Sequence, residues 1–382
     1  MVARKPNHRE LRNVAVFNPG QQGISGIPAP SPKQADRQLD QHNQHIAMDG
    51  TSTMIEHVGI VTGLADFANF LAAVTAAGKR DHGDGDSIKA VLFGLPVSLP
   101  TGLQKEFMSV IEAGFPEVEP YIFPPELVSN DRIDFNDAAT ARLQKTSKKR
   151  IVYGNALPKS FHQLLYAHLK ADEFIFFDNG LSSYWDQQFD TAVKFPKLGI
   201  PVPSIACLSL SPPLNAPDYL NGIPIKELSF SDYDDAYANF RKAAAMSGNG
   251  WLPEHVILGT SIYRTGHLSW NEERSVYLRL IEAVKKRGGE DILFKSHPRA
   301  TERPLIFESD GVSVMESSLP IEAFAKPDSK GTAYGIASTS LISFERYFGW
   351  KSFRIDATET RRAVKKKPHR GLAAAIEPII ID

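Results

Sequence analysis

The chain has 382 residues, of which 42% are hydrophobic and 23% are charged. Its 43 Lys and Arg residues nearly balance its 44 Asp and Glu residues, which excludes a protein that binds nucleic acid through a global positive charge. The single cysteine, Cys207, excludes an intramolecular disulfide framework and a zinc site of four thiolates. At roughly 100–200 residues a domain, this length predicts two globular domains and a tail.

The first fifty or so residues differ from the rest in composition. The stretch 28–44 is rich in Pro, Gln, Asp and Asn and has few residues that fill a core, so we expect a flexible N-terminal segment over 1–52. Gly20, Gly23 and Gly26 recur at intervals of three. The dinucleotide-binding fingerprint has a different spacing and joins a strand to a helix, so we interpret these glycines as polar coil.

Short apolar runs alternate with helical patterns from about residue 55 onward. Strands are predicted at 58–61, 89–93, 150–153 and 174–177, with helices at 64–77, at 103–113 and through 161–168. Strands separated by helices of ~10–15 residues are typical of a parallel sheet covered on both faces. We therefore expect a first Rossmann-like domain over 53–248.

The same alternation returns after the loop-forming cluster at 247–250. Strands are predicted at 255–258, 292–294, 312–315, 334–336 and 353–355, with a long helix at 271–287. We expect a second Rossmann-like domain over 249–382 that ends in a basic segment. The predicted fold class is α/β, with two mostly parallel sheets facing a central cleft, which is the default place for a ligand.

Three polar segments follow predicted strands, at the edge where open parallel sheets bind their ligands. The first begins with Asp178, whose side chain has a reference pKa of ~3.9 and can accept a proton from a polarised hydroxyl at neutral pH. Gly180 lets the chain turn sharply after it. An ordinary turn at the end of a strand explains the same residues.

The second segment places a histidine between two cations. His297 is flanked by Lys295 and Arg299, and Pro298 favours extended backbone at the histidine. An imidazole in this setting can donate a hydrogen bond or a proton to an anionic leaving group such as a phosphate. A basic surface loop is the alternative.

The third segment, which contains Ser338 and Thr339, precedes a helix whose apolar positions include Leu341 and Phe344. The free backbone amides and the dipole at the start of a helix attract an anion. Serine and threonine also cap helices, so both explanations stand.

Together the three segments resemble those of bacterial sialyltransferases of the polysialyltransferase and lipooligosaccharide sialyltransferase type. These families share an acidic–acidic–glycine motif, a His-Pro motif and a Ser-Ser/Thr motif. Asp178 with Gly180 is similar to the first motif, His297 to the second, and Ser338 with Thr339 to the third. The order of the motifs and their place after strands make the combination more specific than any one of them.

The resemblance spans roughly residues 55–356 and implies a GT-B fold and a CMP-activated sugar as donor. It implies that Asp178 is the base, that His297 assists the departure of CMP, and that Ser338 and Thr339 hold the phosphate. A single displacement inverts the anomeric centre. Because protein donors can neutralise a phosphate, we expect neither a metal nor a cofactor.

One position departs from the family pattern. The second residue of the first motif is usually an acid, whereas this chain has Asn179. Asp178 keeps the role of base if the first acid is the base. If the second position transfers the proton, activity is in doubt.

Further candidates accompany these motifs. Gly259 and Thr260 follow the predicted strand 255–258, where a loop can touch the nucleotide. The family pattern implies that Glu322 accepts hydrogen bonds from ribose hydroxyls. An acid that complements a helix dipole explains Glu322 equally well.

Charged clusters complete the sequence features. The acidic stretches 81–86 and 232–235 lack the ligand spacing of a calcium loop, so we interpret them as a solvated loop and a helix cap. The basic run from Arg361 to Arg370 is either a solvated loop or a contact for anionic lipid or polysaccharide. No apolar run reaches the ~18–20 residues of a membrane span, and we expect a cytoplasmic protein with an optional peripheral contact to the inner membrane.

The sequence therefore predicts a GT-B-like glycosyltransferase that moves sialic acid from CMP-sialic acid to a bacterial surface glycan, such as capsule or lipooligosaccharide. Two alternatives stay open. One is a transferase for another activated sugar such as CMP-Kdo, and the other is a glycan-binding protein that kept the fold without turnover. The acceptor, the linkage and the oligomeric state are not readable from the sequence.

Overall fold

A computed structural model describes residues 55–77, 86–93, 101–123, 128–129, 132–133, 143, 149–155, 165–178, 180–184, 191–211, 214–246, 251–298, 303–326, 329–363, 372 and 375–381. All of these belong to one compact unit, residues 52–382. The predicted N-terminal segment, Asn179, Arg299 and the stretch 364–370 lie outside the described residues.

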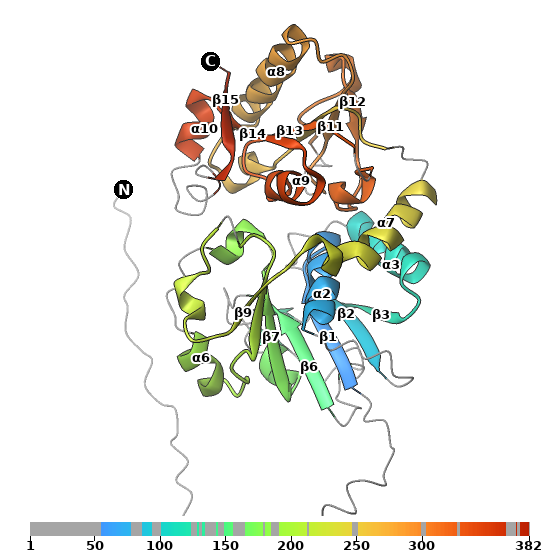
Figure 1. The fold of residues 1–382 in the computed structure, drawn as a ribbon, viewed down its shortest axis with the longest axis vertical. Coiled ribbons are helices and arrows are strands. Elements are labelled where there is room, and N and C mark those ends of the chain that lie inside the picture. The colour runs from blue at the N-terminus through green and yellow to red at the C-terminus, as the bar shows by residue number, and fades with distance from the viewer. Residues whose placement is uncertain are drawn as a thin grey trace, which may run out of the picture. The chain divides into compact units, whose positions relative to one another are not determined.

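The first sheet has seven parallel strands in the order β3-β2-β1-β6-β7-β8-β9 (Figure 1). Their bounds are Ile55–Val61 for β1, Ser87–Phe93 for β2, Val118–Phe123 for β3, Lys149–Gly154 for β6, Glu173–Phe177 for β7, Ile205–Leu208 for β8 and Ile225–Glu227 for β9. A separate antiparallel pair joins β4, Val128–Ser129, to β5, Arg132–Ile133. The central strands β6 and β7 are buried on both faces along their apolar runs, 151–153 and 174–177.

The second sheet has six parallel strands in the order β12-β11-β10-β13-β14-β15. Their bounds are His255–Leu258 for β10, Ile292–Lys295 for β11, Ser313–Met315 for β12, Thr332–Gly335 for β13, Lys351–Asp356 for β14 and Glu377–Ile380 for β15. Two sheets of parallel strands with helices confirm the predicted α/β, GT-B-like class.

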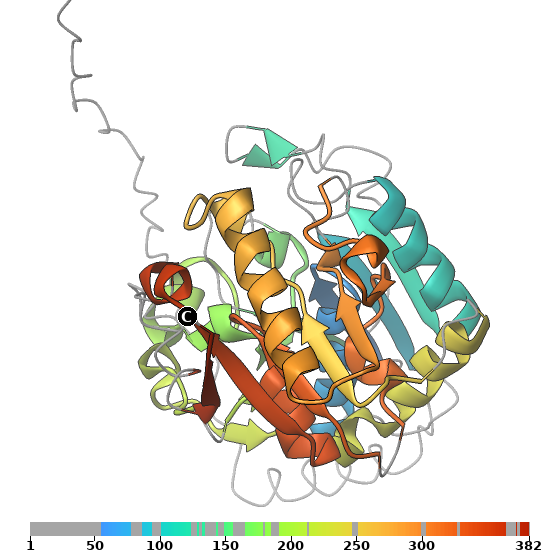
Figure 2. The ribbon, with the colours of Figure 1, turned by 90° about the horizontal axis from the view of Figure 1, so that it is seen from above.

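Helices connect and cover the strands. Their bounds are Leu64–Ala76 for α2, Thr101–Gly114 for α3, Thr191–Lys197 for α6, Asp234–Met246 for α7, Trp270–Lys286 for α8, Ser340–Phe348 for α9 and Thr358–Ala363 for α10. Helix α8 lies across the second sheet (Figure 2) and is fixed at its start by a capping box between Ser269 and Glu272. Helix α7 packs on α2 and α3 of the first sheet. The expected domain boundary at residue 248 falls between α7 and β10, and it stays a prediction.

Both sheets reverse their strand order at an equivalent place. In the first sheet the chain runs outward from β1 to β3 and then returns to β6 on the other side of β1. In the second sheet it runs from β10 to β12 and returns to β13. Such switch points open a crevice outside the carboxyl ends of the strands, which is where open α/β sheets bind ligands.

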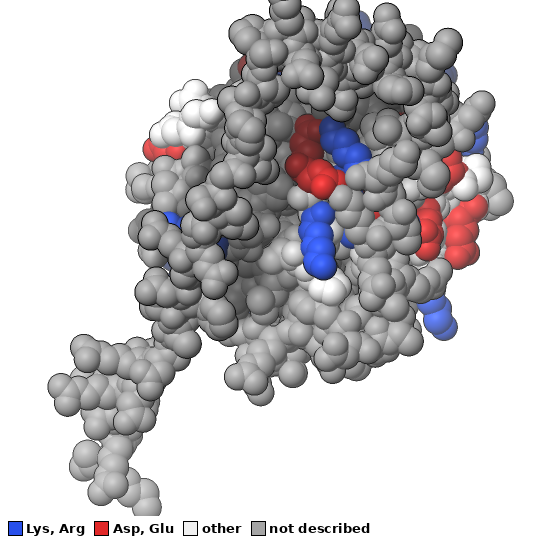
Figure 3. Space-filling view, turned by 90° about the horizontal axis from the view of Figure 1, so that it is seen from below, with Lys and Arg blue, Asp and Glu red and all other residues white. Residues whose placement is uncertain are grey.

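Charges of both signs are interspersed on the surface seen in Figure 3, which shows no large patch of one sign among the described residues. This agrees with the balanced composition of the chain. No helix among the described residues is long and apolar enough to cross a membrane.

Candidate active site

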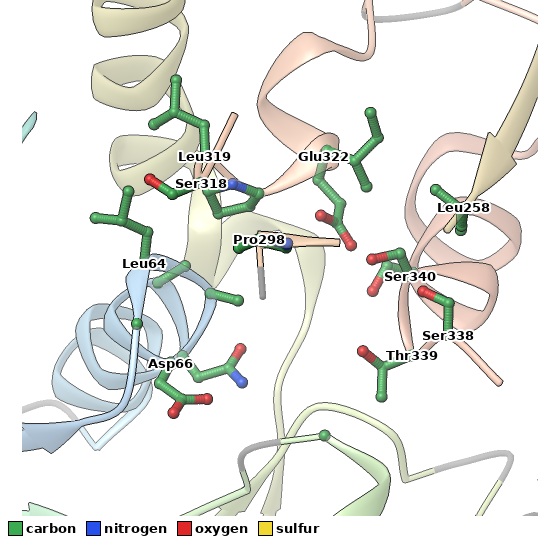
Figure 4. A pocket seen from close by; sticks show the side chains of 18 of the residues that line it. Leu64, Asp66, Leu258, Pro298, Ser318, Leu319, Glu322, Ser338, Thr339 and Ser340 are labelled. Atoms are coloured by element: carbon green, nitrogen blue, oxygen red, sulfur yellow. The ribbon is translucent and has the colours of Figure 1, made fainter. Parts of the chain in front are cut away.

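A cavity of about 460 Å³ lies at the carboxyl ends of strands from both sheets. The first half of the chain contributes the loop after β1, the first turns of α2, the turn after β8 and tyrosines near α7. The second half contributes the ends of β10 and β11, the loop 318–322 and the start of α9 (Figure 4). The predicted cleft thus has a counterpart in a cavity that both halves build.

The start of α9 supplies one wall. Ser338, Thr339 and Ser340 all line the cavity, and the Thr339 side chain makes no hydrogen bond that caps the helix. Capping alone therefore does not explain Thr339. The arrangement presents hydroxyl groups and the positive end of a helix dipole to the cavity, which suits an anion.

The end of β11 and the segment after it supply an ammonium group and an imidazole. Lys295, His297 and Pro298 line the cavity, as the sequence predicts for a leaving-group site. The Lys295 ammonium donates to the carbonyl oxygens of Ser317 and, at 3.3 Å, of Ser296. Burial disfavours its charged form and lowers the pKa of Lys295 to about 8, while nearby carboxylates oppose that shift.

Glu322 lines the same wall and is almost fully buried. Burial raises the pKa of Glu322, and hydrogen bonds from the side chains of Ser340 and Ser343 act in the opposite direction. The carboxylate therefore contacts the first turns of α9 (Figure 4). The structure thus gives Glu322 partners on α9, and its predicted contact with ribose stays a prediction.

Asp178 is fully buried and lies outside the cavity lining. Its Oδ2 accepts hydrogen bonds from the Tyr184 hydroxyl at 2.8 Å, the Ser209 amide at 2.9 Å and the Leu210 amide at 3.2 Å. Its Oδ1 has no hydrogen-bond partner among the described residues. Burial raises the pKa of Asp178 although these donors favour the carboxylate. The visible role of Asp178 is to hold the turn after β8.

Gly180 brings the first motif against the third. Its φ is +88°, in the region that favours glycine, and a Cβ there would lie 2.8 Å from Cγ2 of Thr339. The turn after β7 and the start of α9 are therefore in close contact, although their sequences are about 160 residues apart. The resemblance depended on these two motifs as separate segments, and the structure brings them together.

Gly259 and Thr260 have different environments. Gly259 lines the cavity, and a Cβ on it would come within 2.8 Å of the Lys295 carbonyl oxygen. The Thr260 hydroxyl donates to Glu273 at 2.6 Å, and the Thr260 amide donates to the Tyr277 hydroxyl at 2.9 Å. Thr260 is absent from the cavity lining, so its side chain anchors the loop to α8 instead of facing a ligand.

Helix α9 also contacts the first half of the chain through its last turns. Arg346 donates to the carbonyl oxygens of Ser209 at 2.9 Å and Ser211 at 3.1 Å. The Tyr347 hydroxyl donates to the carbonyl oxygens of Ser209 and Leu228, each at 3.2 Å. The Ser209 backbone therefore links Asp178 to α9. Its N–H donates to Asp178, and its carbonyl oxygen accepts from Arg346 and Tyr347 of α9.

Several cavity residues were missed by the sequence reasoning. Asp66 and Asn69 on α2, and Tyr233 and Tyr347, all line the cavity. Asp66 follows a predicted strand in the first turn of a predicted helix, so the rule that selected Asp178 would also have found it. The tyrosines carry no comparable pattern, because helical aromatic residues usually belong to a core.

The charged clusters have ordinary partners where they are described. Asp232 accepts from the Ser229 amide and hydroxyl, each at 2.7 Å, as expected of a helix cap. No group of three potential metal ligands occurs among the described residues, and the expectation of a metal-free enzyme stays a prediction. In the basic run, Arg361 pairs with Asp356 and Arg362 with Glu272, each at 2.8 Å.

The chain is similar in fold to several solved structures of low sequence identity. Spinosyn forosaminyltransferase SpnP has 11% identity and a TM-score of 0.44, covering 87% of this chain and 86% of that one. The UDP-GlcNAc 2-epimerase from Neisseria meningitidis has 10% identity and a TM-score of 0.43, covering 84% and 90%. MurG from Acinetobacter baumannii has 10% identity and a TM-score of 0.36, covering 86% of each chain. These similarities are weak, and the description of the fold rests on the strand topology alone.

The sequence comparison is more specific. No curated protein matches the chain. Residues 134–357, more than half of the chain, match the family described as alpha-2,8-polysialyltransferase (POLYST). This match includes all three motifs, from Asp178 through His297 to Thr339. The chain is a glycosyltransferase that belongs to the alpha-2,8-polysialyltransferase family.

Proposed function

We propose that the protein transfers sialic acid from CMP-sialic acid to a hydroxyl of a bacterial surface glycan. The observation that carries this proposal is the convergence of His297 and the start of α9 on one cavity. A CMP-sugar presents a phosphate, and this cavity offers an imidazole, the Lys295 ammonium and a helix N-terminus. The family membership supports a nucleotide sugar as donor and a glycan as acceptor.

The proposed reaction is a single displacement. The acceptor oxygen forms a bond to the anomeric carbon while the bond from that carbon to the phosphate oxygen breaks, and its electron pair stays on CMP. His297 donates a hydrogen bond or a proton to that oxygen, and Ser338, Thr339 and the first amides of α9 hold the phosphate. Attack from the face opposite CMP inverts the anomeric centre. Protein donors balance the charge, so the proposal includes no metal.

The motif resemblance assigns the role of base to Asp178. In the described conformation this carboxylate lies beneath the cavity wall, held by Tyr184 and by the turn at Ser209 and Leu210. To accept a proton from the acceptor, Asp178 needs that turn to open and expose Oδ1. Its assignment as base is therefore a proposal that requires a movement.

The test is incubation with CMP-sialic acid and candidate glycan acceptors, with measurement of CMP release and of the anomeric configuration of the product. His297→Ala is expected to lose roughly 10²–10⁴-fold in kcat, the usual size of acid–base assistance. His267→Ala is the matched control, because His267 is exposed and outside the cavity lining. Equal rates for both variants would contradict the assignment of His297 to the active site.

The same assay separates the alternatives. Faster release of CMP from CMP-Kdo than from CMP-sialic acid would identify CMP-Kdo as the donor. Binding of glycan without release of CMP from either donor would support a glycan-binding protein.

We propose a cytoplasmic location with peripheral contact to the inner membrane through the basic run from Arg361 to Arg370. Since Arg361 and Arg362 are already paired, the contact depends mainly on the consecutive lysines of the run, Lys365, Lys366 and Lys367, with Arg370 beyond them. Replacing these three lysines with Gln should abolish sedimentation with anionic vesicles at 0.15 M salt. Replacing Arg361 and Arg362 instead should change it little, and the reverse pattern would refute the assignment.

A further inference from the structure

The cavity wall opposite the proposed phosphate site contains an asparagine that no motif assigns. The phosphate site, at His297 and the start of α9, belongs to the second half of the chain. A hydroxyl that displaces CMP from the opposite face therefore approaches along the first half, where α2 lines the cavity (Figure 4). Asn69 lies on α2 and belongs to this lining. It is therefore on the side from which the acceptor enters.

Two hydrogen bonds fix the orientation of the Asn69 side-chain amide. Its Oδ1 accepts from the Tyr233 hydroxyl at 2.8 Å, and its Nδ2 donates to the backbone carbonyl oxygen of Asp178 at 2.9 Å. Because a carbonyl oxygen can only accept, the NH2 group must face Asp178 and the amide has a single orientation. Tyr233 is almost fully buried at 1% exposure, so the group that holds the amide is itself held.

One donor of this amide is left for a ligand. A side-chain amide nitrogen carries two N–H groups, and the bond to Asp178 uses one of them. The second N–H has no partner among the residues that the structure describes. Asn69 is partly exposed and lines the cavity, so an oxygen atom of a bound molecule can accept from it. A sugar, with several hydroxyl oxygens, is a ligand of the right chemistry.

The same amide is attached to the residue that the motif resemblance assigns as base. The Asp178 N–H donates to the carbonyl oxygen of Cys207 in β8 at 3.2 Å, and its carbonyl oxygen accepts from Asn69. The main chain of Asp178 is thus held by β8 and by α2. Neither bond has to break when the carboxylate leaves the turn at Ser209. A molecule bound to Asn69 therefore stays beside Asp178 during that movement.

We infer that Asn69 binds the acceptor sugar and orients its hydroxyl toward Asp178, an inference that rests on the proposed function. The second N–H of Asn69 donates to an oxygen of the acceptor, and the acceptor hydroxyl gives its proton to the Asp178 carboxylate. The electron pair of the broken O–H bond forms the bond to the anomeric carbon. The electron pair of the broken carbon–oxygen bond leaves with CMP. Asn69 exchanges no proton in this reaction, and its role is to position the acceptor.

Transfer to water separates binding of the acceptor from the integrity of the site. Without a glycan, water takes the place of the acceptor, and release of CMP then reports on the donor site and the base. In Asn69→Ala, kcat/KM for the glycan is expected to fall roughly 10–100-fold, because a hydrogen bond to the substrate is lost. Hydrolysis of CMP-sialic acid and the KM for the donor are expected to stay within about fivefold of the wild type. An asparagine needed only to hold Asp178 would slow both reactions by the same factor.

Asn239→Ala is the matched control. Asn239 is also a partly buried helical asparagine, on α7, and it lies outside the cavity lining. Its side chain accepts from Lys242 at 3.2 Å. Both reactions are expected to stay within about twofold of the wild type in this variant. Melting curves of the two alanine variants check that each folds.

Tyr233→Phe gives a second readout with little change in packing. It keeps the ring and removes the hydroxyl that donates to Asn69, while the bond from Asn69 to Asp178 remains. The amide is then fixed by one bond instead of two, so the KM for the glycan should rise roughly 2–10-fold while hydrolysis is unchanged. A wild-type ratio of transfer to hydrolysis in both Tyr233→Phe and Asn69→Ala would overturn the inference.

Failure of the two proposals looks different. If the wild type releases no CMP from CMP-sialic acid, with a glycan or with water, the proposed function fails and the inference fails with it. If the wild type transfers sialic acid and Asn69→Ala slows transfer and hydrolysis by the same factor, only the inference is overturned.

Discussion

The contact between Gly180 and Thr339 provides a quantitative test of how the two motifs meet. In Gly180→Ala, the backbone keeps a φ of +88° that costs an alanine roughly 1–2 kcal/mol. The new Cβ also lies 2.8 Å from Cγ2 of Thr339, so one of the two turns must shift. Crowding of this kind costs on the order of 1–3 kcal/mol more.

Gly222→Ala is the control for the backbone alone. Gly222 has a φ of +80° and nothing within 4 Å of its Cβ position, so only the first cost applies. The free energy of unfolding, measured in urea at 25 °C, should therefore fall further in Gly180→Ala than in Gly222→Ala. The KM for the donor should rise only in Gly180→Ala, because the displaced Thr339 lines the proposed phosphate site.

A second substitution tests the cause. Thr339→Ser removes Cγ2 and leaves the hydroxyl, whose oxygen lies 3.6 Å from the Cβ position. The double variant should recover most of the crowding cost when compared with Thr339→Ser alone. Equal losses in Gly180→Ala and Gly222→Ala, or no recovery in the double variant, would refute the close contact of these turns.

Three further outcomes follow from polar groups in and around the cavity. The pKa of Lys295 is about 8 in the folded chain against 10.5 in the unfolded one. Between these pH values the unfolded chain therefore binds one more proton than the folded chain, so the free energy of unfolding rises with pH. In urea titrations from pH 7 to 10.5, Lys295→Met should lose that rise. Arg346→Ala should destabilise the protein by roughly 1–3 kcal/mol, because two carbonyl oxygens, including that of Ser209, lose a charged donor; an unchanged urea midpoint would show that these bonds contribute nothing. Asp178→Ala should be less stable than Asp178→Asn by on the order of 1–3 kcal/mol, since only the alanine leaves the Ser209 amide without this acceptor, whereas the Leu210 amide keeps the Tyr184 hydroxyl; thermal melting of the pair checks this order.

The strands that the sequence predicted have local apolar runs, although β8, Ile205–Leu208, has such a run too and was missed. Central strands such as β6, β7 and β10 are buried on both faces, so nearly every residue must be apolar and the pattern is visible without knowledge of neighbours. The edge strands β3 and β15 were missed. Each contains a proline, Pro120 or Pro378, which an edge strand tolerates and which argues against a strand in sequence reasoning. Strand β9 was missed because all three of its residues are exposed.

The motifs were likewise visible as residue types after strands. Their placement in one cavity could be expected from the carboxyl edges of two parallel sheets, and His297, Ser338 and Thr339 all line it. Thr260 shows the limit of that rule. Its position after β10 is right for a ligand, but the Glu273 carboxylate on α8 takes its hydroxyl away from the cavity.

The balanced charge, the two series of parallel strands and the three motifs were therefore determined by the sequence alone, because each depends on residue identity or on local order. Which carboxylate faces the cavity was decided by tertiary structure. Asp178 and Asp66 both follow a strand, and that position alone does not say which of them faces the cavity. The turn after β8 closes over Asp178, whereas the start of α2 leaves Asp66 on the cavity wall. That difference arises from segments distant in sequence that pack against each strand end, which no local pattern encodes.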